Sequence, residues 1–203
     1  MKRATRNPAQ TRQQIIEKAA PIFNKYGYAG TKLVMLIEAT GFQKGGIYCH
    51  FDSKMDLARA VFKYNFRKLR ALYRRPSDTT LTYKEQLLGN INSFKKYIHT
   101  PPITGGCPLL NMAVEADDTD EDNRLLVKAC INEWRDELIT ILENGVHAGE
   151  FRADINITQE AFFIIASIEG SIMLGQVKRS IGLMMGVADS LEQYIRARIF
   201  EQV

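Results

Sequence analysis

The chain has 203 residues, of which 45% are hydrophobic, enough for one large or two small domains with a buried core. Three cysteines, an odd number without paired spacing, argue against a secreted disulfide framework and for a reducing cytoplasm. The longest apolar run, Ala161 to Leu174, carries Glu169 and is too short to cross a bilayer, so we expect no membrane segment. Three histidines without metal-ligand spacing, and no nucleophile motif, lead us to expect no metal, no cofactor and no enzyme activity.

The net charge of +4 conceals an uneven distribution of charge along the chain. Residues 1–75 hold 16 Lys and Arg against 4 Asp and Glu, whereas the remainder holds 11 against 19. Clustered positive charge gains free energy by releasing counterions from phosphates, so the first third is expected to bind a polyanion such as nucleic acid. The alternative interpretation is an ordinary solvated charged face.

Helix signals fill the first third of the chain, and strand alternation is almost missing from it. Asn7 followed by Pro8 predicts the start of a first helix, Thr31 is expected to cap a second, and Gly41 separates the second from a third. Ser53 and Asp56 resemble a capping box that opens a long fourth helix. The expected helices cover 7–27, 31–38, 43–49 and 53–75.

Five further helices are expected after a connection at 76–80. Thr82 with Glu85 forms a second capping box, and Pro108 occupies a first helical position. The expected helices cover 82–99, a segment from 108, a segment from about 117–122 to 145–149, then 158–179 and 183–200. The chain is therefore predicted to be all-α with about nine helices. The expected domains are 1–52 and 76–203, joined by the helix 53–75.

The second and third helices, joined by a tight turn at Gly41, fit a helix-turn-helix, whose second helix enters the DNA major groove. Gly45 and Gly46 lie inside that short helix and each costs it about 1 kcal/mol relative to alanine. Close approach of the helix backbone to DNA is one explanation. Tight packing against another helix is the other.

At these residues the sequence resembles the tetracycline-repressor (TetR) family of transcriptional regulators. The similar part runs from "TRQQIIEKAAPIFNKYGYAGT" through "IEATGFQKGGIYCHFDSKMDLARAVF", Thr11 to Phe62. It contains the signature G-x-x-K-G-x-[IL]-Y-x-H-F-x-S-K in register with an upstream G-Y-x-x-T. The resemblance implies a homodimer with an N-terminal DNA-binding domain and a helical C-terminal domain that holds the dimer interface and an effector pocket.

The resemblance also implies roles for single residues. Thr31 would offer its hydroxyl or amide to a phosphate, and Tyr48 and Lys54 would touch phosphates. Gln43 can read an adenine edge, and Lys44 can reach guanine or phosphate. The candidate DNA-binding residues are Thr31, Lys32, Gln43, Lys44, Gly45, Gly46, Tyr48, His50 and Lys54. The chain departs from the family pattern in its apolar second helix, 33–37.

A weaker resemblance, to a subgroup with a glycine-cysteine motif, covers "GGCPLLNMAVEADD". Cys107 precedes Pro108 at a helix N-terminus, where the helix dipole stabilises a thiolate, so it is a sensor, part of a pocket wall or an inert core residue. Glu169 has apolar helical neighbours, so its carboxylate is expected to meet a ligand, a basic side chain or a cap. The effector or sensor candidates are Cys107, Cys130, Trp134 and Glu169.

Ser167, Ser171 and Gly175 recur every four residues and would let another helix approach closely. They indicate a dimer interface on the last two helices, although packing within the chain produces the same pattern. The sequence thus predicts a cytoplasmic, dimeric DNA-binding regulator, a repressor released from a near-palindromic operator by a small-molecule or thiol-reactive effector. The alternative is a helical protein-interaction module whose degenerate helix-turn-helix no longer binds DNA.

Overall fold

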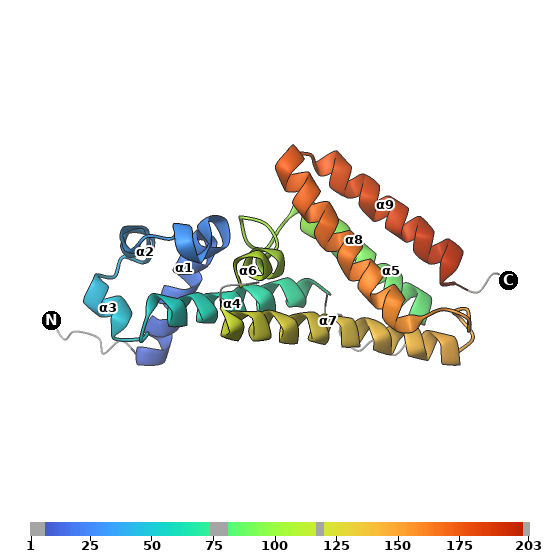
Figure 1. Ribbon diagram of the computed structural model, residues 1–203, viewed down its shortest axis with the longest axis horizontal. Coiled ribbons are helices and arrows are strands. Elements are labelled where there is room, and N and C mark those ends of the chain that lie inside the picture. Colours follow the sequence, from blue (N-terminus) through green and yellow to red (C-terminus); the bar gives the residue numbers. More distant parts are fainter. Residues whose placement is uncertain (1–6, 74–80, 117–119, 201–203) are drawn as a thin grey trace. The chain divides into compact units, whose positions relative to one another are not determined.

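A computed structural model of the chain describes residues 7–73, 81–116 and 120–200. Within these ranges it contains nine α-helices and, apart from one isolated antiparallel bridge between Phe151 and Phe200, no β-structure, which confirms the all-α class (Figure 1). The helices are α1 (Pro8–Gly30), α2 (Leu33–Thr40), α3 (Lys44–Tyr48), α4 (Lys54–Tyr73), α5 (Tyr83–His99), α6 (Pro108–Ala116), α7 (Glu121–His147), α8 (Ile157–Lys178) and α9 (Ile181–Arg198).

The predicted start signals act as expected at several helices. The Asn7 side chain accepts a hydrogen bond from the Ala9 N–H at 3.0 Å, and Pro8 is the first residue of α1. Thr82 and Glu85 form the predicted capping box of α5, and Pro108 begins α6. The connection expected at 76–80, including the proline expected to end the fourth helix, lies outside the described residues.

The prediction that Thr31 caps α2 is wrong. The N-cap residue is Lys32, because the Thr31 hydroxyl instead donates to the Gly27 carbonyl oxygen of α1 at 2.5 Å. Gly27 has φ 66° and ψ −177°, so α1 breaks at the glycine where its end was predicted, and a further turn continues to Gly30. The Thr31 side chain is 1% exposed and belongs to the interior.

The chain divides into two compact units. The first consists of Met1–Leu69 and Ile103–Leu125, and the second of Arg70–Pro102 and Leu126–Val203. The first unit includes residues 103–125, which the sequence analysis placed with the C-terminal domain. The chain therefore leaves the first unit, returns to it through α6, and leaves it again.

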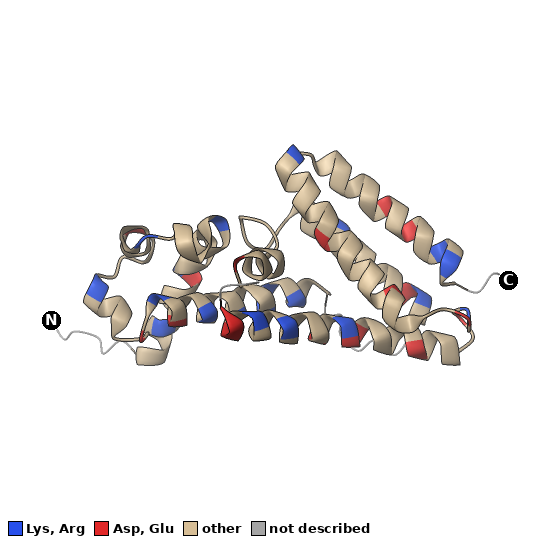
Figure 2. Cartoon of the chain, viewed as in Figure 1, with Lys and Arg blue, Asp and Glu red and all other residues tan. Residues whose placement is uncertain are grey.

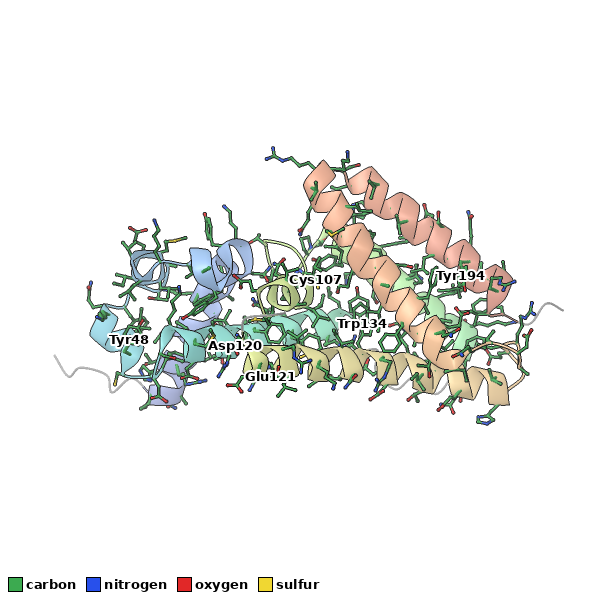
Figure 3. The ribbon with its side chains drawn as sticks, in the orientation of Figure 1. Tyr48, Cys107, Asp120, Glu121, Trp134 and Tyr194 are labelled. Carbon is green, nitrogen blue, oxygen red and sulfur yellow. The ribbon has the colours of Figure 1, made fainter. Side chains whose placement is uncertain are left out.

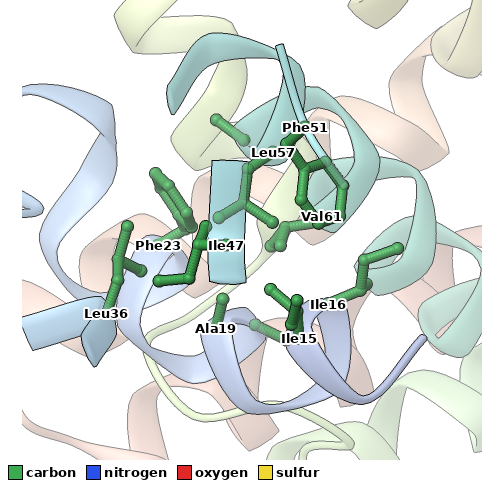
Figure 4. Packing of buried hydrophobic residues seen from close by; sticks show 11 residues of the cluster. Ile15, Ile16, Ala19, Phe23, Leu36, Ile47, Phe51, Leu57 and Val61 are labelled. Carbon is green, nitrogen blue, oxygen red and sulfur yellow. The ribbon is translucent and has the colours of Figure 1, made fainter. Parts of the chain in front are cut away.

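The core of the first unit is formed by one apolar face from each of its N-terminal helices (Figure 4). Its labelled members are Ile15, Ile16, Ala19 and Phe23 of α1, Leu36 of α2, Ile47 of α3, Phe51, and Leu57 and Val61 of α4. Burying a Val, Leu, Ile or Phe side chain stabilises by about 1.5–3 kcal/mol. The short helices α2 and α3 thus depend on tertiary packing more than on their own hydrogen bonds.

The second unit packs α5, the larger part of α7, α8 and α9. Its fully buried side chains include Leu87, Ile91, Phe94, Leu138, Leu142, Ile164 and Ile168. A Cβ at Gly175 of α8 would overlap the side chain of Met184 on α9, so this glycine lets α8 and α9 of one chain approach closely. Packing within the chain, the alternative left open by the sequence, therefore explains Gly175.

One helix of the described part, α8, is long and apolar enough to cross a membrane when judged by length and composition alone. The same helix buries Ala161, Ile164 and Ile168 in the second unit. Other large apolar side chains of α8, Phe162 and Val177 among them, are exposed.

Candidate nucleic-acid interface

The turn between α2 and α3 is fixed by backbone and hydroxyl hydrogen bonds. Gly41 has φ 73° and ψ 10°, and its N–H donates to the Ile37 carbonyl at 2.8 Å, a left-handed helix end that favours glycine. The Thr40 hydroxyl donates to the Leu36 carbonyl at 2.6 Å and accepts from the Phe42 N–H at 3.2 Å. These bonds set the direction in which α3 leaves the turn.

The recognition helix α3 is anchored by one side chain and open on the rest of its surface. Ile47 is 1% exposed and packs in the core of the first unit. Gln43, at the N-cap, and Lys44 and Gly45, in the first turn, are exposed. The arrangement presents an amide, an ammonium and bare backbone next to one another, the donor and acceptor types that read base edges and phosphates.

The two glycines of α3 are not explained by packing within the chain. A Cβ at Gly45 would have nothing within 4 Å, and one at Gly46 would meet only the Phe42 side chain, at an ordinary 3.5 Å. The explanation that another helix packs tightly against them is therefore wrong for the described part of the chain. Room for an external backbone or base remains as the other explanation.

The remaining predicted DNA-binding residues also lie in the first unit, around α3 and the helix starts on either side of it. Lys32 is exposed, Tyr48 and His50 are half-buried, and Thr31 is buried. The Lys54 ammonium lies 4.3 Å from the centroid of the Tyr28 ring. Lys and Arg recur along α4, which begins at Lys54 (Figure 2).

The effector and sensor candidates fall into different units. Cys107, at the start of α6, is 1% exposed and belongs to the first unit (Figure 3). Cys130 and Trp134 of α7 are 8% and 3% exposed, Glu169 of α8 is half-buried, and these three belong to the second unit. Of the three cysteines, Cys49 is the exposed one.

Trp134 lies in an aromatic and cationic cluster of the second unit. Its ring centroid is 5.7 Å from that of Tyr73 and 5.9 Å from the Arg70 guanidinium carbon. Arg70 is 4% exposed and pairs with Glu137. The buried indole Nε1 of Trp134 has no hydrogen-bond partner among the described residues. A buried donor without a partner carries a desolvation cost that a ligand or water oxygen would remove.

A pocket of about 340 Å³, counting the part open to solvent, lies between α1, α4 and α6 of the first unit. Phe62 and Met112 supply apolar walls, and Asn65 and Glu115 supply polar groups. No role for Asn65, Glu115 or Tyr28 was predicted from the sequence. Only the tyrosine had a signal, its place in the G-Y-x-x-T motif.

Taken together, the helix-turn-helix, the open recognition helix and the basic first third define a DNA-binding regulator of the helix-turn-helix class. Residues 15–61 match the family described as "Bacterial regulatory proteins, tetR family". Residues 84–191 match the family described as "Tetracyclin repressor-like, C-terminal domain". The chain belongs to the TetR family of transcriptional regulators.

Similar proteins support this assignment over most of their length. The HTH-type transcriptional repressor DhaR of Mycobacterium sp. (strain GP1) is 27% identical over 171 residues, 83% of this chain and 84% of that protein. A TetR transcriptional regulator from Chloroflexus aurantiacus J-10-FL has 35% identity and a TM-score of 0.91, covering 98% of this chain and all of the other. A TetR-family regulator from Cytophaga hutchinsonii has 36% identity and a TM-score of 0.86, covering 99% of this chain and all of the other.

Proposed function

We propose that this regulator is a cytoplasmic repressor that binds a near-palindromic operator as a homodimer. The observation that carries the proposal is the open surface of α3, where exposed Gln43 and Lys44 stand beside a glycine whose Cβ would meet nothing. In a dimer the two recognition helices would enter major grooves about one helical turn, roughly 34 Å, apart. Operator symmetry would then mirror the symmetry of the dimer.

The proposed roles of the site residues divide by what they touch. Gln43 reads a base edge, Lys44 reaches guanine or phosphate, and Tyr48 and Lys54 bind phosphates. Lys32 and His50 lie beside them as further backbone contacts. For Thr31 we retain only a contact through its backbone amide, because its hydroxyl is bonded to Gly27.

A dimer interface on α8 and the neighbouring start of α9 accounts for their exposed apolar side chains. The group comprises Phe162, Phe163, Met173, Leu174, Val177 and Ile181, each at least 43% exposed. Several large apolar side chains exposed on one helix and the start of the next are the kind of surface that marks a protein contact site. A second copy of this chain is the proposed occupant.

We propose that release from DNA follows the binding of an effector in the second unit. Trp134, with its unpartnered indole N–H, and Glu169 are the candidate ligand contacts in the second unit, with Cys130 nearby in sequence. Cys107 is the candidate for a thiol-reactive effector, which must reach a side chain that is 1% exposed. In a Cys49→Ser background, which removes the exposed thiol at the end of α3, a further Cys107→Ser change should keep the DNA bound in the presence of a mild electrophile such as N-ethylmaleimide.

Selection of bound duplexes from a random DNA pool tests the proposed function. An enriched inverted repeat supports a dimeric, sequence-specific regulator, and a Gln43→Ala variant should change preference at one base pair of each half-site. Affinity should fall steeply as salt rises, because phosphate contacts release counterions. No enrichment from a folded dimer would contradict the proposal and favour the interaction module.

A further inference from the structure

Glu115, near the end of α6, reaches the backbone of α1 immediately after the break in that helix. The Tyr28 N–H lies 2.8 Å from both carboxylate oxygens of Glu115, and the Ala29 N–H lies 3.5 Å from Oε1. Gly27 just before them has φ 66°, and a Cβ there would overlap the carboxylate. Glycine at this position therefore serves both the backbone conformation and the close approach of Glu115.

Two asparagines hold residues 104–111, which lead into α6 and form its first turn, against α1. Asn24 donates its side-chain N–H groups to the carbonyl oxygens of Thr104 and Gly106, both at 2.9 Å. Asn111 donates in the opposite sense, to the carbonyls of Asn24 at 2.9 Å and Gly105 at 2.8 Å. Residues 104–115, although distant in sequence, are thus fixed to the last turns of α1, by the asparagines near their beginning and by Glu115 at their end.

Tyr28 links this arrangement to the start of α4. Its amide is held by Glu115, and its ring lies under the ammonium of Lys54, the first residue of α4. A cation over the face of an aromatic ring is attracted by the ring quadrupole. The contact also limits the rotamers that a half-buried lysine samples before a phosphate arrives, which lowers the entropy lost on binding.

We infer that Tyr28 and Glu115 are positioning residues for DNA binding, which act by holding the Lys54 ammonium where it meets a phosphate. The inference rests on the proposed phosphate contact of Lys54. Glu115 fixes the backbone at Tyr28, the backbone sets the position of the Tyr28 ring, and the ring holds the Lys54 ammonium. Neither positioning residue needs to touch DNA.

The test uses the full-length protein and a fluorescein-labelled duplex of mixed sequence at low salt, because a phosphate contact does not depend on sequence. Tyr28→Leu should weaken binding about fivefold, whereas Tyr28→Phe, which keeps the ring, should stay within about twofold of the original affinity. Glu115→Ala should weaken binding by a similar factor. Glu17→Ala removes one carboxylate from α1 away from these contacts and should leave affinity unchanged or slightly higher.

The deciding measurement is a double variant, Tyr28→Leu with Lys54→Ala. If Tyr28 acts through Lys54, the double variant binds as Lys54→Ala alone does. Additive losses, or a Tyr28→Phe variant as weak as Tyr28→Leu, would overturn the inference. Thermal unfolding identifies variants that bind weakly because they are unfolded. If Tyr28→Leu is unfolded, the same comparison is made with Glu115→Ala, alone and combined with Lys54→Ala, because the Glu115 side chain is only half-buried.

The two proposals fail in distinguishable ways. Unchanged affinity for Lys54→Ala removes the phosphate contact itself, and the inference with it. Weaker binding for Lys54→Ala but not for Tyr28→Leu or Glu115→Ala leaves the contact standing and overturns only the positioning.

Discussion

Glu192 on α9 accepts hydrogen bonds from two cations of the second unit. Lys95 on α5 lies 2.8 Å from Oε2, and Arg196, one turn further along α9, donates to Oε1 at 2.8 and 3.0 Å. Lys95 also pairs with Asp189 at 2.8 Å. These side chains tie α5 to α9, and the Lys95 and Glu192 side chains are 23% and 24% exposed, whereas Asp189 is 56% exposed.

The stability that this cluster adds should disappear in acid. Lys95, followed by Arg196, holds the pKa of Glu192 below its ordinary value of 4.5, and Asp189 and Glu192 raise the pKa of Lys95 above 10.5. A lowered carboxyl pKa stabilises the fold above that ordinary value, and this contribution is lost as pH falls through the lowered pKa. A raised lysine pKa stabilises the fold fully below 10.5, and that contribution changes only as pH rises above this value, so it is constant across the acid range. Glu192→Gln should therefore lower the free energy of unfolding by about 1 kcal/mol at neutral pH.

Urea unfolding of both proteins between neutral pH and about pH 3 measures the difference, which should shrink as Glu192 is protonated. Asp154→Asn is the matched control. The Asp154 pKa is also lowered, by Arg152, but its side chain is 70% exposed and the pair should add nothing measurable. If the difference in unfolding free energy between the original protein and Glu192→Gln stayed constant down to about pH 3, the ionised Glu192 carboxylate would not be its cause.

Gly45→Ala should separate stability from DNA binding. The added methyl has open space, so the folded state should be unchanged or more stable by up to about 1 kcal/mol through helix propensity. DNA affinity should fall, because the methyl stands where the bare backbone is proposed to meet DNA. Thermal unfolding and DNA titration give the two quantities. Gly41→Ala is the contrast, since φ 73° makes it destabilise the fold directly.

Val177→Asp on α8 should convert the dimer to a monomer without unfolding it. Val177 is 77% exposed in the single chain, so the charge costs nothing there, but it would be buried against a second copy at the proposed interface. Sedimentation velocity measures the change. Val114→Asp, at a valine on α6 that is 74% exposed, should remain a dimer. Equal behaviour of the two variants would place the interface elsewhere.

Thiol labelling of the native protein should show one fast cysteine. Cys49 is exposed, whereas Cys107 and Cys130 are buried and should react only as fast as the fold opens. Cys49→Ser should remove the fast phase with a chromogenic disulfide reagent, and all three cysteines should react in denaturant. Fast labelling of Cys107 in that variant would show that a thiol-reactive effector reaches α6 without local opening.

The helices and the helix-turn-helix were predictable because their signals are local. Asn7 with Pro8, and Thr82 with Glu85, specify a helix start within four residues. Thr31 misled the same reasoning, because its hydroxyl had a competing acceptor one turn back in α1. A capping preference indicates what a side chain can do, and the folded backbone decides which acceptor it finds.

The contact of Glu115 with Tyr28 joins residues 87 positions apart, and no spacing rule connects them. No spacing rule shows either that Cys107 and Trp134 belong to different units, since only the folded chain shows that residues 103–125 join the first unit. The open space around Gly45 could not be predicted either, because the sequence shows that this residue has no side chain but not which atoms lie near it in the fold.

The return of residues 103–125 to the first unit has a consequence for how such a protein can be recombined. A single crossover after α4 would exchange the N-terminal helices of two relatives but leave Asn111 and Glu115 behind. The grafted Tyr28 would then meet an α6 that changed independently of it. A functional transplant of DNA-binding specificity must therefore carry two separate stretches of gene, or limit itself to the few exposed positions of α3.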